Sequence, residues 1–287
     1  VKDDDREILG KYYQSFFFFE SKALRSTDFV TIELKHIFRQ DDQVFIDLLN
    51  RIRNNDVNQD VLDELNKRYI PDFDPDSGGG YITLTTHNYQ AQAINDSKLE
   101  KLPGKTHSFT AVVKDDFPEF SYPNATELVL KTGAQVMFIK NDLSGDKLFF
   151  NGKIGHILSF DDDIIVVRCP GDDFNIRVEM AEWQNMKYTL NEDTKEIEEE
   201  VIGTFTQYPL KLAWAITIHK SQGLTFDRAV IDASAAFAHG QVYVALSRCR
   251  SLEGLVLSSR IGRRSLTDNP VVSEFVNGPL QELSGRN

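Results

Sequence analysis

The 287-residue chain has little cysteine and no long apolar run. Its two cysteines, Cys169 and Cys249, are too few for a disulfide framework and lack the paired spacing of metal ligands. A reducing, cytoplasmic setting is therefore expected, and no residue is assigned to a metal. No run of about 18 apolar residues occurs, so no membrane span is expected. The acidic start VKDDDREILG does not have the pattern of a signal peptide.

The chain also lacks a phosphate-binding loop of the form Gly-x-x-x-x-Gly-Lys-Ser/Thr. Gly78-Gly79-Gly80 is not followed by Lys-Ser or Lys-Thr, and Gly104-Lys105-Thr106 has Leu99 where the first glycine belongs. Without that loop, nothing is predicted to cradle the β- and γ-phosphates or to place a hydroxyl on Mg²⁺. We therefore do not expect the chain to be an ATPase by itself.

Charge is unevenly distributed. The net charge of −12 argues weakly against binding polyanions over the whole surface. Residues 208–265, however, hold eight Lys and Arg against three Asp and Glu, whereas residues 141–207 hold six against fifteen. A basic segment beside an acidic one can still offer a single surface to phosphates.

Periodicity predicts how the chain is organised. Residues 1–70 look mostly helical, although Phe16–Phe19 is read as a buried strand or helix edge and 29–34 alternates like a strand. Residues 71–80, rich in proline, acid and glycine, are typical of a linker. A strand over 81–86 then leads into a helix that begins at His87 or Asn88, which is the unit of a parallel α/β sheet.

The next part of the chain is predicted to be all-β. Short strands are expected over 134–139, 150–158, 164–168 and 174–178, with a hairpin signal at Asn151-Gly152. Several short strands with turns indicate a small barrel. The acidic stretch 192–200 is read as a solvated hairpin or loop. Residues 266–287 are expected to form a short terminal helix and a frayed end.

Residues 212–250 hold two short polar segments, 217–223 and 243–248. Each is bounded by apolar residues that can fix its backbone. The first, 217–223, is predicted to form a turn or short helix closed by Gly223. A buried strand at 229–231 and a helix over 240–246 follow, and Arg248 comes at the end of that helix. By themselves Arg248 could simply complement the helix dipole, and Arg39 could be a surface ion-pairing residue. His219 alone would more often be structural, and Lys220 alone a surface charge.

Taken together, these segments resemble a known family. TIHKSQG followed by VALSR is similar to the last two motifs of superfamily 1 helicases, most of all the 5′-to-3′ branch of PIF and RecD-like enzymes. The segment VTIELKHIFRQ, residues 30–40, matches the same family. The resemblance covers roughly residues 5–262. It implies an ATP-dependent DNA helicase whose phosphate-binding loop and Mg²⁺ ligands precede the matched part.

The resemblance implies an α/β fold with a RecA-like second motor domain and an inserted SH3-like β-barrel. Residues 1–70 would complete the first RecA-like motor domain, 71–80 would be the linker, and 81–140 and 208–265 would form the second motor domain. Residues 141–207 would be the barrel and 266–287 a tail. The chain is then expected to be a monomeric C-terminal fragment. Its expected partners are the missing N-terminal motor half and single-stranded DNA, and no association with a membrane is expected.

The resemblance also implies roles for single residues. Arg39 and Arg248 would be catalytic, stabilising charge on the γ-phosphoryl group of ATP from opposite sides of a cleft. Nucleotide binding is assigned to Gln222, Gly223 and Thr225. DNA binding is assigned to Thr86, Asn88, Thr217, His219 and Lys220. Capping of the following helix alone would also explain Thr86 and Asn88.

Two other functions stay open. The chain could be a module that binds single-stranded nucleic acid without a motor, which would need aromatic residues such as Tyr188 and Phe205 on an exposed barrel face. It could also be a helicase-derived platform for protein interaction. That reading has to explain why both motifs and Arg39 are intact.

Overall fold

The computed structural model describes residues 3–27, 30, 32, 36–76, 80–190, 196–233, 240–266 and 269–277. The chain divides into two compact units, 1–38 with 267–287, and 39–266. Each unit is described by itself. Within the described ranges, no helix is both long and apolar enough to cross a membrane.

The smaller unit joins the two ends of the chain. It contains α1 (Asp3–Leu9), the 3-10 helix η1 (Phe18–Glu20), α2 (Lys22–Arg25) and the C-terminal α7 (Pro270–Asn277). The ring of Phe19 stacks on that of Phe275 with centroids 4.2 Å apart. The run 16–19 thus ends in a helical turn in which Phe19 is buried, whereas the other three phenylalanines are exposed. The strand predicted at 29–34 lies mostly outside the described residues.

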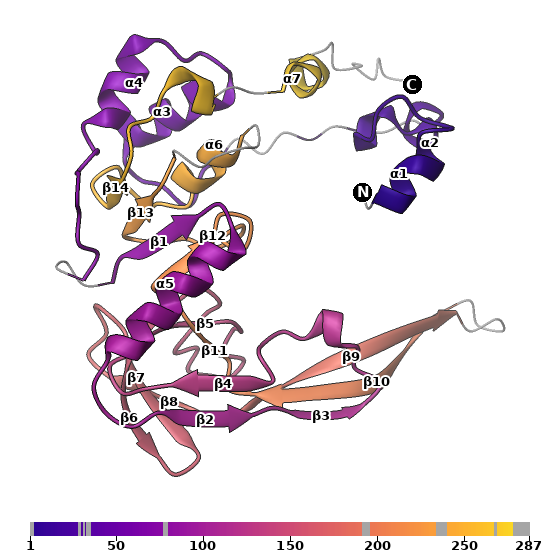
Figure 1. Cartoon of the computed structure of the whole chain (residues 1–287). Coiled ribbons are helices and arrows are strands. Elements are labelled where there is room, and N and C mark those ends of the chain that lie inside the picture. The colour runs from indigo at the N-terminus through magenta and orange to yellow at the C-terminus, as the bar shows by residue number, and fades with distance from the viewer. Residues whose placement is uncertain are drawn as a thin grey trace. The chain divides into compact units, whose positions relative to one another are not determined.

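The larger unit is built on a four-stranded parallel sheet in the order β12-β1-β13-β14 (Figure 1). Its strands are β1 (Ile82–Thr85), β12 (Ala215–Thr217), β13 (Ala229–Ile231) and β14 (Leu255–Leu257). Every residue of β13 and β14 is buried, as expected of a parallel sheet that is covered on both faces. The predicted strands at 81–86 and 229–231 are confirmed.

Helices pack around this sheet, and their sequences explain where they begin. They are α3 (Gln43–Arg53), α4 (Gln59–Asn66), α5 (Asn88–Lys101) and α6 (Gln241–Leu246), followed by the 3-10 helix η3 (Arg263–Leu266). Asp42 and Asn58 cap α3 and α4 by accepting bonds from backbone N–H groups three residues on. His87 is the N-cap of α5 but makes no side-chain cap bond.

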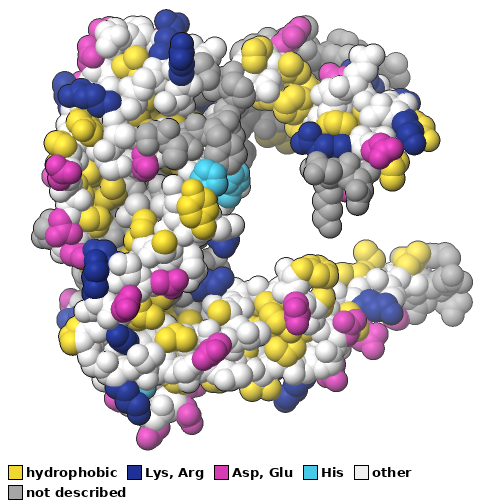
Figure 2. All heavy atoms as spheres, in the orientation of Figure 1, with side chains coloured by type: hydrophobic (Ala, Val, Ile, Leu, Met, Phe, Trp, Pro, Cys, Tyr) yellow, Lys and Arg dark blue, Asp and Glu magenta, His cyan; other side chains and the backbone are white. Residues whose placement is uncertain are grey.

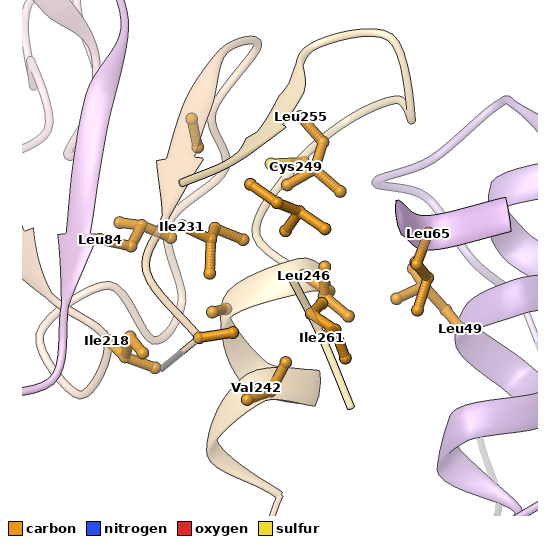
Figure 3. Packing of buried hydrophobic residues seen from close by; sticks show 14 of the residues in the cluster. Leu49, Leu65, Leu84, Ile218, Ile231, Val242, Leu246, Cys249, Leu255 and Ile261 are labelled. Carbon is orange, nitrogen blue, oxygen red and sulfur yellow. The ribbon is translucent and has the colours of Figure 1, made fainter. Parts of the chain in front are cut away.

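Residues 39–70 share one core with the parallel sheet, which corrects the predicted domain boundary. Leu49 and Leu65 belong to the same buried cluster as Leu84, Ile231 and Leu246 (Figure 3). The Ile70 backbone N–H donates to Leu257 O of β14 at 3.1 Å. Residues 71–76 and 80 therefore belong to the larger unit, and the division lies between residues 38 and 39.

The β-rich insertion consists of three sheets. A five-stranded antiparallel sheet has the order β11-β5-β6-β7-β8, a three-stranded sheet has β3-β10-β9, and β2 pairs with β4. These strands are β2 (His107–Thr110), β3 (Val112–Asp115), β4 (Glu127–Leu130), β5 (Gln135–Phe138), β6 (Ile154–Asp161), β7 (Ile164–Arg168), β8 (Asn175–Val178), β9 (Ala181–Leu190), β10 (Ile197–Gln207) and β11 (Leu210–Leu212). A short 3-10 helix, η2 (Glu119–Ser121), lies between β3 and β4.

The insertion has its own hydrophobic core, which includes Phe138, Val167 and Tyr208. The predicted turn at Asn151-Gly152 connects β5 to β6, with Gly152 in the left-handed region at φ 101°. Because strands before residue 141 and after residue 207 belong to these sheets, the all-β region is wider than the predicted range 141–207. Figure 2 shows acidic and basic side chains intermingled over this part of the molecule rather than one continuous basic face.

Candidate nucleotide and nucleic-acid site

The polar segment 217–223 begins at the carboxyl end of the parallel strand β12, beside the carboxyl end of β1. Thr85 of β1 is the register partner of Thr217 of β12, and the Ile218 backbone N–H donates to Thr85 O at 2.8 Å. The loops that follow these two strands therefore begin side by side. In open parallel sheets this edge is where ligands bind.

The loop after β12 is held rigidly from inside. Thr217 Oγ1 accepts from the Lys220 backbone N–H at 3.4 Å, and Ser221 Oγ donates to Ile218 O at 2.7 Å. Gly223 has φ +83°, a conformation that favours glycine. Thr217 and Ser221 are buried, whereas His219 and Lys220 are exposed. The predicted turn is confirmed, and its buried side chains fix the backbone that presents the exposed ones.

Arg39 contacts the far end of this loop. Its Nε donates to Thr225 Oγ1 at 2.9 Å, and its Nη1 donates to Ser247 O at 3.1 Å. The neighbouring Gln40 is buried and donates from Nε2 to Ser247 O at 3.1 Å and to Cys249 O at 2.9 Å. Arg39 and Gln40 thus make three hydrogen bonds to backbone carbonyls of Ser247 and Cys249, just after α6. Arg39 makes a fourth to the side chain of Thr225.

Arg248 lies beside Arg39, at the C-terminal end of α6. Its Nε donates to Val244 O at 3.0 Å, and its Nη2 donates to Ser247 Oγ at 2.9 Å. Burial, and secondarily the charge of Arg39, lower the pKa of the Arg248 guanidinium. Both arginines belong to the larger unit, so the expectation that they face each other from opposite sides of a cleft does not describe this structure.

The two arginines are suited to an anion. In the described ranges, neither forms an ion pair with a carboxylate. Two neighbouring guanidiniums without a counter-ion offer several N–H donors in planar geometry, which phosphate oxygens accept well. The donor set fits the phosphate end of a nucleotide. The described residues contain no group of three or more His, Cys, Asp or Glu that could hold a metal ion, so no residue here is assigned to Mg²⁺.

The same loop contributes Thr217, Lys220 and Gln222 to a groove of about 960 Å³. We call it the α5–β12 groove, because α5 and β12 line it together with β4, β5 and β11. Three of the five residues predicted to bind DNA line it, namely Asn88, Thr217 and Lys220. The Asn95 side chain also donates to Ala215 O, 120 residues later, so segments more than 100 residues apart in sequence meet in one groove.

Some predicted residues lie elsewhere. Thr86 is buried, lies 2.8 Å from His87 Nδ1 through its Oγ1 and donates to Gln90 Oε1 at 3.3 Å, so it does not line the groove. His219 is exposed but also does not line it. Gln222, predicted to bind nucleotide, lines the groove instead, whereas Thr225 contacts Arg39 as described.

Three further residues of the site, Lys211, Tyr89 and Gln40, belong to no motif of the sequence that predicts a function for them. Lys211 and Tyr89 line the α5–β12 groove, and Gln40 anchors the end of α6. Only Gln40 carried a signal, as the neighbour of Arg39. Of the two aromatic residues proposed to stack on bases, Tyr188 is 62% exposed but Phe205 is fully buried in the insertion. Phe205 therefore offers no stacking surface.

Comparison with known proteins places these features in a family. Residues 212–256 match the model of the UvrD-like helicase C-terminal domain. ATP-dependent DNA helicase PIF1 of Rattus norvegicus is 36% identical over 260 residues, an alignment that covers 83% of this chain and 37% of the relative. The chain thus spans a little over a third of that relative.

Two solved structures extend the comparison. The chain is 41% identical to Bacteroides sp Pif1 in complex with ADP-AlF4, with a TM-score of 0.86 over 96% of this chain and 63% of that one. It is 42% identical to Bacteroides Pif1 bound to ssDNA, with a TM-score of 0.64 over 96% of this chain and 62% of that one. The chain belongs to the Pif1 family of superfamily 1 helicases.

Proposed function

We propose that this chain is the part of an ATP-dependent DNA helicase that supplies two arginines to the γ-phosphate of ATP and one groove to single-stranded DNA. The observation that carries the proposal is the meeting of Arg39 and Arg248 at Ser247, since Arg39 and Ser247 are 208 residues apart in sequence. Among the described residues the two arginines have no carboxylate partner, and Lys220 lines the α5–β12 groove. These observations support one phosphate site at the arginines and another in the groove.

At the nucleotide, the arginines would neutralise negative charge that develops on the transferred phosphoryl group. An arginine in this role raises the rate by roughly 10³ to 10⁵. ATP would supply the phosphoryl group. The Mg²⁺ ligands and the phosphate-binding loop would come from the part of a Pif1 helicase that is not aligned with this chain. The relative complexed with ADP-AlF4 supports nucleotide binding by the family.

At the groove, Lys220 and Asn88 would contact the phosphates of a single DNA strand. The loop 217–225 would couple the two sites, because Thr217 lines the groove while Thr225 accepts a bond from Arg39. A shift of the arginines on ATP binding would thereby reach the DNA contacts. Repeated over the hydrolysis cycle, this coupling would give directed movement, which we propose to be 5′-to-3′ by resemblance to the PIF and RecD-like branch.

We further propose that the β-rich insertion is the SH3-like module of this family, and that it helps to hold the strand along the groove. Support comes from the shared lining of the groove, to which β4, β5 and β11 contribute together with α5 and β12. The intermingled charges of the insertion favour contact through one edge only. Function as a monomer also stays a proposal.

The DNA side can be tested on the chain as it is. Fluorescence anisotropy with a labelled oligothymidine should show binding that weakens with salt, and Lys220→Ala should weaken it further. Lys101→Ala, at the exposed C-terminal turn of α5 and outside the groove, is the matched control and should bind like the original chain. Unchanged affinity in Lys220→Ala would contradict the DNA assignment and favour an interaction platform.

A further inference from the structure

Lys211 is a second lysine of the α5–β12 groove with no assigned role. It is the central residue of β11 and the register partner of Met137 in β5. Lys211 lines the groove together with Lys220, which comes nine residues later in the sequence. It is partly buried, and within the described residues it forms no hydrogen bond or ion pair through its side chain.

The electrostatics of the groove are unfavourable without a ligand. Burial, and then the charge of Lys220, lower the pKa of Lys211. Two carboxylates, Asp96 and Glu127, also line the groove. Each accepts a bond from a neighbour of its own, Asp96 from Gln92 at 2.8 Å and Glu127 from Ser108 at 2.7 Å, and neither is ion-paired to Lys211. A partly buried cation facing another cation costs stability unless an anion is bound between them.

We propose that Lys211 and Lys220 together hold the DNA backbone, with Lys211 as a phosphate-binding residue on the floor of the α5–β12 groove. The inference rests on the proposed function and adds a residue from a different strand and sheet to it. A phosphodiester that bridges the two ammonium groups would relieve their repulsion, and it would fix the strand against β11 as well as against the loop after β12.

The remaining lining indicates a single strand rather than a duplex. Tyr89, at the start of α5, is 69% exposed and lines the same groove. An exposed aromatic ring near phosphate-binding lysines can stack on a base, which is accessible only when the base is unpaired. The groove thus combines two cations for phosphates with one ring for a base.

The test compares Lys211→Gln, Lys220→Gln, the double variant and the control Lys101→Gln. Oligothymidine affinity is measured at several salt concentrations, and thermal unfolding is measured without DNA. Each groove variant should weaken binding and lower the steepness of the salt dependence, by about 0.7 in log Kd per log salt for each lost phosphate contact on a single strand. Lys211→Gln should unfold at the same temperature as the original chain or higher, because the repulsion is removed.

The outcomes separate the two proposals. Absence of oligothymidine binding by the original chain would overturn both. Binding that Lys220→Gln weakens, but that Lys211→Gln leaves unchanged in affinity and salt dependence, would overturn the inference and leave the proposed function standing. A Lys211→Gln variant that unfolds at lower temperature, with binding not restored in Lys211→Arg, would show a structural role and also overturn the inference.

Discussion

Arg39 and Arg248 both bond to Ser247, one to its backbone and the other to its side chain. Arg39 donates to the Ser247 carbonyl oxygen at 3.1 Å, and Arg248 donates to its hydroxyl at 2.9 Å. The separation of the two guanidiniums is thus determined within one compact unit.

Gln40 should be as important for this arrangement as the arginines. In Gln40→Ala, the Cys249 carbonyl oxygen loses its side-chain donor, whereas the Ser247 carbonyl oxygen keeps the bond from Arg39 Nη1. Leaving a buried acceptor without a partner costs about 1–3 kcal/mol. Urea unfolding should show that loss of stability. The control is Gln43→Ala. Gln43 is exposed, and within the described part of the chain its side chain bonds only to Asp47 one turn on, so this substitution should change stability little. Equal stability of the two variants would contradict the anchoring role.

The assignment of residues 39–70 to the larger unit can be tested by a core truncation. Leu65 is fully buried in the cluster that contains the parallel sheet, so Leu65→Ala should lower the free energy of unfolding of the whole unit by about 2–5 kcal/mol. Val44→Ala truncates an exposed apolar side chain on α3 and should cost little. If residues 39–70 formed part of another domain, the sheet would unfold at the same denaturant concentration in Leu65→Ala as in the original chain.

Alkaline pH should weaken DNA binding through Lys211. Its pKa in the free chain is lowered from the usual 10.5 by burial and by Lys220, with Asp96 and Glu127 the carboxylates of the same groove. Charged Lys211 therefore destabilises the fold below its lowered pKa, and this penalty disappears as pH rises through it. A bound phosphate would favour the charged form, so affinity should fall as the free chain loses that proton.

The measurement is oligothymidine affinity as a function of pH, at constant salt. The original chain should lose affinity at lower pH than Lys211→Gln does, because only the original chain must take up a proton at Lys211 when it binds. Parallel pH profiles for the two proteins would contradict a charged Lys211 in the complex.

The sequence predicted the elements that are bounded by strong patterns. The strand at 229–231 and the helix at 240–246 were predictable because the buried β-branched run and the buried face of Val242, Ala245 and Leu246 have clear periods. The turn at 217–223 followed from its glycine. Motif order then indicated Arg39 and Arg248 together, although the two are distant along the chain.

The domain boundary could not be predicted in the same way. Prolines, acids and glycines at 71–80 have the composition of a linker, yet the chain just before them pairs with β14, with the Leu257 N–H donating to Arg68 O at 2.9 Å. Arg68 also bonds to Leu255 O, 187 residues later, and local composition holds no information about so distant a partner. Lys211 was missed because its immediate sequence does not show that β11 and the loop after β12 line the same groove.

A catalytic role of Arg39 and Arg248 is tested most directly by DNA-stimulated ATP hydrolysis. The protein to measure is this chain joined to a first motor domain of the same family that carries a phosphate-binding loop. The joined protein should hydrolyse ATP faster with oligothymidine present. Arg39→Ala and Arg248→Ala should each lower the rate by roughly 10³ or more while the protein stays folded. Undiminished hydrolysis in both variants would contradict the proposal that the two arginines act on the γ-phosphate of ATP. Hydrolysis by the chain alone that Arg248→Ala does not affect would contradict it as well.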